Sequence, residues 1–150
     1  MTRIYLPLNQ DIRMFVFVKS RFMRIDHIAL YCRDLEGMRQ FFIDHFSAVN
    51  NEQYHNPRTG LRTYILTFPD GGARLEIMQR PDTVDADPSK PNIGFVHVSF
   101  AVSSAEAVDS KTAELAGAGY RVASGPRTTG DGYYESSIIG PEGIQIEITV

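Results

Sequence analysis

The stretches RIDHIALY (residues 24–31) and GFVHVSF (residues 94–100) decide the fold that we expect of this 150-residue chain. Each places one histidine, His27 or His97, among alternating apolar residues. Such alternation is typical of a β-strand with one buried and one exposed face. Because the two histidines lie 70 residues apart in matching surroundings, the pattern predicts two copies of one module.

A glutamate follows each histidine at nearly the same distance. Glu76 lies in RLEIM (residues 74–78), 49 residues after the first histidine, and Glu147 lies in QIEIT (residues 145–149), 50 residues after the second. Aliphatic residues flank both glutamates, so these stretches also predict half-buried strands. Ionisable groups are costly to bury without a partner. One shared divalent metal would satisfy all four groups, which we expect on the concave face of a curled sheet.

From residue 23 onward the chain predicts the order strand, helix and three strands, twice. In the first module we expect a helix capped by Asp34 and strands at residues 24–31, 48–54, 61–68 and 73–79. In the second we expect a helix capped by Ser103 with Glu106, and strands at residues 93–102, 120–123, 132–139 and 144–149. The predicted fold class is α+β, with tandem βαβββ modules that form a curled mixed sheet around a metal site.

The chain is expected to form one domain over residues 23–150, with the modules at about 23–80 and 92–150. A polar, proline-bounded linker at about 81–91 separates them. Residues 1–22 precede the repeat and are predicted to be a peripheral or poorly ordered extension.

Composition excludes several classes of protein. The net charge of −3 is small and mixed in sign, so no basic surface for nucleic acid or an anionic membrane is expected. No apolar run approaches the roughly 18 residues of a membrane span. Cys32 is the only cysteine, which excludes an internal disulfide and is consistent with a reducing cytoplasm. We expect it to be a small buried thiol.

Two histidines and two glutamates suit a catalytic divalent metal. Neutral imidazole nitrogens and carboxylate oxygens bind nickel and zinc, and also cobalt, manganese and iron. Four such ligands leave two positions of a six-coordinate metal open to water or substrate. A metal there can polarise a carbonyl or hold two neighbouring oxygens as an enolate forms. A glutamate beside it can act as a general base at the adjacent carbon.

Four residues near the expected ligands are candidates for substrate binding: Tyr31, Tyr64, Arg74 and Met78. Tyr31 and Met78 each lie on a ligand strand, on the face predicted for the ligands. Tyr64 lies on the neighbouring strand. Arg74 shares the face of Glu76 and can reach an anionic substrate group.

These paired strands, together with the GPEG turn at residues 140–143, resemble the vicinal oxygen chelate superfamily and, within it, the glyoxalase I-like proteins. The resemblance covers residues 23–150 and implies tandem βαβββ modules that enclose one metal. By position, it implies that the ligands are His27, Glu76, His97 and Glu147. A histidine as the first ligand resembles the bacterial members that favour nickel or cobalt, and zinc remains a candidate.

The resemblance also implies an activity. Glyoxalase I converts the hemithioacetal of methylglyoxal and glutathione into S-lactoylglutathione through a metal-bound enediolate. Glu147 would be the main base and Glu76 a ligand that shares in the proton transfer. Tyr31 and Arg80 stand where bacterial members have an arginine and an asparagine, so the substrate class stays a small 2-oxo compound or a thiol adduct. A homodimer is expected, with the site within one chain or shared between two.

Four alternative functions use the same fold. Ring-cleaving dioxygenases and fosfomycin-modifying transferases resemble this chain but use two histidines and one glutamate, so Glu76 argues against both. An acyl-CoA epimerase has glutamine at the position of Glu76. A metal-free resistance protein that binds a flat molecule lacks the four ligands and uses tryptophan, which this chain does not contain.

Overall fold

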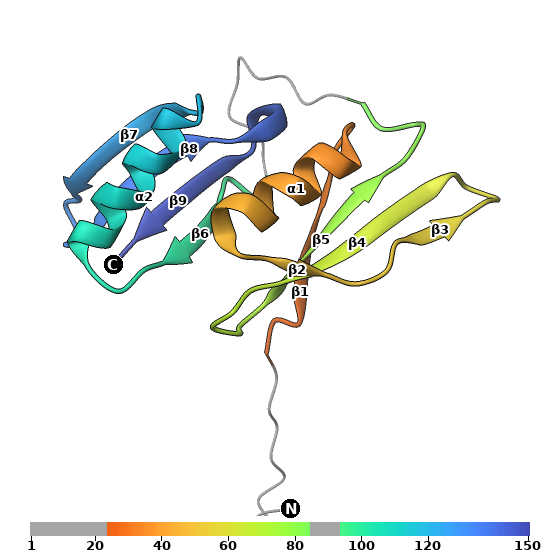
Figure 1. The fold of residues 1–150 in the computed structure, drawn as a ribbon, viewed down its shortest axis with the longest axis horizontal. Helices are drawn as coiled ribbons and strands as arrows, with labels where there is room; N and C mark the ends of the chain where they lie inside the picture. Colours follow the sequence, from red (N-terminus) through yellow and green to blue (C-terminus); the bar gives the residue numbers. More distant parts are fainter. Residues whose placement is uncertain (1–23, 85–93) are drawn as a thin grey trace, which may run out of the picture.

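The computed structural model describes residues 24–84 and 94–150, which form two open β-sheets with one helix each (Figure 1). The first sheet and its helix comprise β1 (His27–Tyr31), α1 (Leu35–Phe46), β2 (Val49–Asn50), β3 (Tyr54–Asn56), β4 (Leu61–Thr67) and β5 (Arg74–Gln79). The second comprises β6 (Val98–Ala101), α2 (Ala105–Gly117), β7 (Arg121–Thr128), β8 (Tyr134–Ile139), the short 3₁₀ helix η1 (Pro141–Gly143) and β9 (Gln145–Thr149). The predicted extension at residues 1–22 and most of the linker lie outside the described residues.

Both sheets have the same strand order, as the repeat predicts. The first runs β1-β5-β4-β2, with β3 paired to β4, and the second runs β6-β9-β8-β7. In each, the first strand is parallel to the last, whereas the other pairs are antiparallel. The α+β class with tandem modules of mixed sheet is therefore confirmed. The sheets lie side by side and do not close around a common centre (Figure 1).

Helix α1 follows from local sequence signals. The Asp34 side chain caps its first turn by accepting the backbone N–H of Gly37 at 2.9 Å. The helix ends at Ser47, which adopts a left-handed conformation with φ 53°. Its apolar face buries four side chains: Leu35, Met38, Phe41 and Phe42.

One continuous core joins the two sheets. The rings of Phe46 on α1 and Phe100 on β6 are 4.3 Å apart, and Phe41 packs edge-on against Tyr120 at 4.8 Å. The Glu142 carboxylate adds a polar connection, because it accepts the backbone N–H groups of Arg33 and Asp34 at 2.7 Å each. Helix α1 thus packs against both halves of the chain.

Four sequence-based boundaries were wrong. The strand expected at 120–123 is the longer β7, which continues to Thr128 along β8. The strand expected at 48–54 is split into β2 and β3, because the Asn51 side chain accepts the backbone N–H of Ile65 at 2.7 Å and replaces a ladder bond. Ser104, rather than Ser103, caps α2 by accepting the N–H of Ala107. The strand expected at 93–102 is observed only from Val98 to Ala101, and residue 93 lies outside the described part of the chain.

Candidate metal centre

The first predicted pair of ligands is assembled by β1 and β5. These strands are parallel, with Ala29 opposite Glu76 and His27 opposite Arg74. The His27 and Glu76 side chains therefore share one face of the sheet, and His27 Nε2 lies 3.8 Å from Glu76 Oε2. Both remain accessible, at 43% and 21% of their side-chain areas. The opposite face carries the buried Leu75 and Ile77, as the alternation predicts.

Asp26 fixes the orientation of the His27 ring. The Asp26 carboxylate lies 3.1 Å from His27 Nδ1 and also bonds the guanidinium of Arg74. These two contacts, with that of His27 the larger, hold the pKa of Asp26 below its usual value. A carboxylate only accepts, so the Nδ1–H of His27 donates to Asp26, and Nε2 lies on the side of Glu76. This is the arrangement of a metal-binding histidine with a carboxylate behind it.

The second pair repeats this spacing: His97 directly precedes β6, and Glu147 lies on β9. His97 Nε2 lies 3.6 Å from Glu147 Oε2, with 36% and 20% of the side chains exposed. Ser99 faces Glu147 across the parallel pair and donates its hydroxyl to Glu147 Oε1 at 2.6 Å. The buried neighbours of Glu147 are Ile146 and Ile148 on the opposite face.

Each pair has the spacing of two ligands of one ion. Ligands about 2.1 Å from a metal, with an angle of 90–120° between them, lie about 3.0–3.6 Å apart. The observed separations of 3.8 and 3.6 Å require only small side-chain adjustments. However, no group of three or more His, Cys, Asp or Glu side chains within residues 24–84 and 94–150 is close enough to hold a metal. The described residues of one chain therefore hold the four groups as two separate pairs, because the pairs lie on separate open sheets.

A further carboxylate lies beside the second pair. Glu135 on β8 faces Thr149, two residues along β9 from Glu147. Burial and the neighbouring charge of Glu147 raise the pKa of Glu135. Arg127 partly offsets this at 3.5 Å from Glu135. Each half of the site thus has a second carboxylate and an arginine beside its His–Glu pair: Asp26 with Arg74 in the first half and Glu135 with Arg127 in the second.

Tyr31 and Met78 border the first pair, as expected. They are register partners on β1 and β5, on the same face as His27 and Glu76, and Tyr31 is 50% exposed. Arg80 is held by Asp82 through two bonds of 2.7 and 2.8 Å, and Asp82, followed by the smaller influence of Tyr31, raises the pKa of Arg80. The two positions that depart from the glyoxalase pattern therefore lie near each other.

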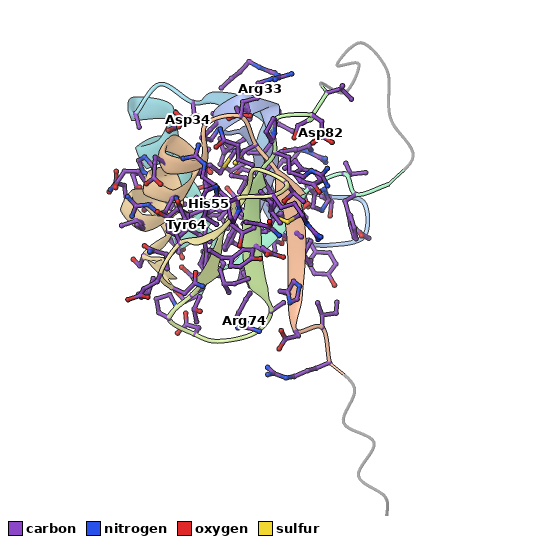
Figure 2. The ribbon with its side chains drawn as sticks, turned by 90° about the vertical axis from the view of Figure 1, so that its right-hand side faces the viewer. Arg33, Asp34, His55, Tyr64, Arg74 and Asp82 are labelled. Atoms are coloured by element: carbon purple, nitrogen blue, oxygen red, sulfur yellow. The ribbon has the colours of Figure 1, made fainter. Side chains whose placement is uncertain are left out.

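Arg74 lies beside the first pair and Tyr64 does not. Arg74 lies at the start of β5, where Asp26 holds its guanidinium next to His27 (Figure 2). Tyr64 lies on the α1 side of the sheet, where its hydroxyl donates to Glu36 at 2.9 Å (Figure 2). The expectation that Tyr64 borders the ligands is wrong, because its register partner is the core residue Ile77.

The structure adds Asp26, Ser99 and Glu135 to the residues predicted from the sequence. Asp26 precedes a predicted ligand and Ser99 lies two residues after one, so both signals were visible in the chain. The position of Glu135 depends on the pairing of β8 with β9.

A groove of about 500 Å³ runs beside this face, between β1 and the segment that leads into β6. Its lining includes Tyr31, Phe95, Val96 and His97. Phe95 and Val96 are 87% and 68% exposed, which is unusual for apolar side chains close to a polar site.

The chain belongs to the Glyoxalase/Bleomycin resistance protein/Dioxygenase superfamily, whose family model matches residues 24–148. The uncharacterised protein YqjT of Bacillus subtilis (strain 168) is 27% identical over 126 residues, which cover 81% of this chain and 94% of YqjT. A glyoxalase family protein from Bacillus cereus superposes with a TM-score of 0.72 at 19% identity, covering 89% of this chain and 97% of that one.

A glyoxalase I and a fosfomycin resistance protein share the fold. Leishmania major glyoxalase I, described as trypanothione-dependent, has a TM-score of 0.67 at 15% identity and covers 85% of this chain and 86% of its own. The fosfomycin resistance protein FosX of Listeria monocytogenes, in complex with Mn(II) and sulfate, has a TM-score of 0.64 at 15% identity and covers 86% and 93%. Members of the superfamily are often enzymes and commonly bind a divalent metal. Within the described residues, no helix has the length and apolarity to cross a membrane.

Proposed function

We propose that this protein is a metal-dependent lyase or isomerase of the glyoxalase I type, which moves a proton between adjacent carbons of a small 2-oxo compound or its thiol adduct. The duplicated His–Glu pair is the observation that carries this proposal. Each pair places an imidazole nitrogen and a carboxylate oxygen 3.6–3.8 Å apart on an accessible sheet face. Two such pairs together supply four ligands of the types preferred by nickel and zinc.

We propose that the complete site combines two chains of a homodimer. His27 and Glu76 of one chain would meet His97 and Glu147 of its partner, and a two-fold axis would produce two equal sites. The separation of the pairs within one chain supports this arrangement. The exposed apolar residues Phe95 and Val96 beside the open faces also favour contact with a second copy.

These four residues would hold one divalent metal, with nickel or zinc as the first candidates. When bound, the metal supplies positive charge that polarises two neighbouring substrate oxygens. Glu147 would accept the proton from one carbon and return it to the next. Asp26 orients the His27 ring so that Nε2 is directed at the site. Tyr31 and Met78 would line the space beside the first pair.

The pairing of Arg80 with Asp82, and the tyrosine at position 31, favour a thiol other than glutathione. Arg80 has its guanidinium paired with Asp82, so its charge is already neutralised. Neither position therefore offers the free arginine and amide that bacterial glyoxalase I has there. The adduct of methylglyoxal with another thiol is accordingly the first substrate to compare with the glutathione adduct.

The test is an assay of protein loaded with nickel or zinc, using methylglyoxal with glutathione and with other thiols. We expect turnover that requires the metal, and Glu147→Gln should reduce kcat about a hundredfold or more while metal remains bound. Glu52→Gln, in an exposed loop, is the matched control and should leave turnover unchanged. Metal-free purified protein that gains no activity with any divalent metal would refute the proposal, and unchanged turnover of Glu147→Gln would refute the role of that residue.

A further inference from the structure

The two halves of the site differ at one repeat-related position. Ala29 lies opposite Glu76 in the first parallel strand pair, and Ser99 lies opposite Glu147 in the second. Both positions follow the histidine by two residues, so both side chains share the face of the ligands. Only the second module therefore carries a hydroxyl group next to its glutamate.

This hydroxyl group holds one oxygen of Glu147. Ser99 Oγ donates to Glu147 Oε1 at 2.6 Å, a short distance typical of a hydroxyl bonded to a carboxylate. The other oxygen, Oε2, is thereby left on the side of His97, at 3.6 Å. Within the described residues, Glu76 receives no comparable bond, and its recorded neighbour is His27 at 3.8 Å.

A neighbouring carboxylate affects which orientation the Glu147 side chain adopts. Glu135 on β8 is the diagonal neighbour of Glu147 across the antiparallel pair, and carboxylates on adjacent strands repel each other. A glutamate side chain has several rotatable bonds, so repulsion alone would favour rotamers that turn Glu147 away from Glu135. Because β9 lies between β6 and β8, the Ser99 hydroxyl on β6 binds Oε1 on the side away from Glu135 and so fixes one of those rotamers.

We propose that Ser99 is a positioning residue that anchors Glu147 by Oε1, so that Oε2 alone is directed at the metal and the substrate. The proposal rests on the proposed function. In proton transfer, Oε2 would take the proton from one carbon and deliver it to the next while Oε1 stays on the Ser99 hydroxyl. Anchoring reduces the motion required of the base and so affects the chemical step more than substrate binding.

Three variants test the proposal. Ser99→Ala removes the hydroxyl, Ser99→Thr keeps one, and Ser110→Ala is the control on the exposed side of α2. The first readout is metal affinity by calorimetric titration of the dimer with nickel. The second is the separate determination of kcat and KM with the nickel-loaded protein. Residues behind metal ligands typically contribute 10–100-fold to affinity or activity, which sets the expected size.

We expect Ser99→Ala to weaken nickel binding about tenfold and to lower kcat at least about tenfold with little change in KM. Ser99→Thr should restore both values, and Ser110→Ala should match the wild type. The double variant Ser99→Ala/Ala29→Ser moves the hydroxyl to Glu76 and should remain impaired in kcat. Recovery of the wild-type kcat in this double variant would overturn the proposal, because a hydroxyl next to Glu76 would then be as effective as one next to Glu147.

The two readouts separate this proposal from the proposed function. A wild-type protein that binds nickel but turns over no 2-oxo compound or thiol adduct would refute the proposed function, and nickel affinity alone would then decide the role of Ser99. Equal nickel affinity and equal kcat in Ser99→Ala and wild type would overturn the anchoring of Glu147. A loss that Ser99→Thr does not restore would also overturn it, because the hydroxyl would not be the cause.

Discussion

Mixing two inactive variants tests whether the site is shared between chains. Glu76→Ala removes one ligand from the pair on the first sheet, and Glu147→Ala removes one from the pair on the second. Both side chains lie outside the apolar core and are 21% and 20% exposed, so each variant is expected to fold. In a dimer of either variant, both sites lack one ligand.

The separation of the two His–Glu pairs determines how much activity a mixture of the two variants should regain. In a shared arrangement, a mixed dimer has one site that contains both substitutions and one site in which all four ligands are present. An equal mixture with free subunit exchange contains about one half mixed dimers, so about a quarter of the wild-type sites are restored. If one chain supplied all four ligands, every site in the mixture would lack a ligand and the recovery would be zero.

The assay follows turnover of the nickel-loaded mixture over time, with subunit exchange checked by native mass spectrometry. The matched control mixes Glu76→Ala with His27→Ala. These substitutions damage the same pair, so no mixed dimer regains a complete site. A mixture that exchanges subunits but retains only the residual activity of its separate components would refute the shared site.

Three further predictions concern the scaffold of the site. Glu142→Ala removes the acceptor of two backbone N–H groups before α1, and we expect the free energy of unfolding to fall by about 2 kcal/mol in chemical denaturation. Hydrogen bonds from Arg39 and Tyr64 lower the pKa of Glu36 from 4.5, so its stabilising contribution is present above that value and lost as pH falls through the lowered pKa. The stability difference between wild type and Glu36→Gln, measured by denaturation at several pH values, should therefore shrink on acidification, and a difference independent of pH would contradict this. Burial, with neighbouring carboxylates, raises the pKa of Cys32 to about 12, so a thiol reagent at neutral pH should modify it only after unfolding.

The faces of the ligand strands could be predicted from the sequence because alternation is a local property. Aliphatic residues flank Glu76 and Glu147, which places each glutamate on the face opposite the core. The same applies to Asp34, whose side chain caps α1 within three residues of its own position. Cys32 is buried, as expected of a lone thiol with apolar neighbours.

Register and side-chain competition could not be predicted in the same way. Tyr64 is a wrong candidate for substrate binding because its orientation depends on how β4 pairs with β5, and its hydroxyl bonds Glu36 on α1. In the second module, the hydroxyl of Tyr134 likewise bonds a carboxylate on the neighbouring helix, because it donates to Asp109 on α2. The break between β2 and β3 likewise depends on the Asn51 side chain, which binds a neighbouring strand.

The sequence by itself determined the repeat, the α+β class and the two His–Glu pairs, since each follows from spacing and from the alternation of residues along single strands. Only the tertiary structure decided that the pairs lie apart. The strand order places them on two open sheets, and the shared core around Phe46 and Phe100 holds those sheets side by side. No local pattern encodes that arrangement, because it depends on packing between residues distant in the chain.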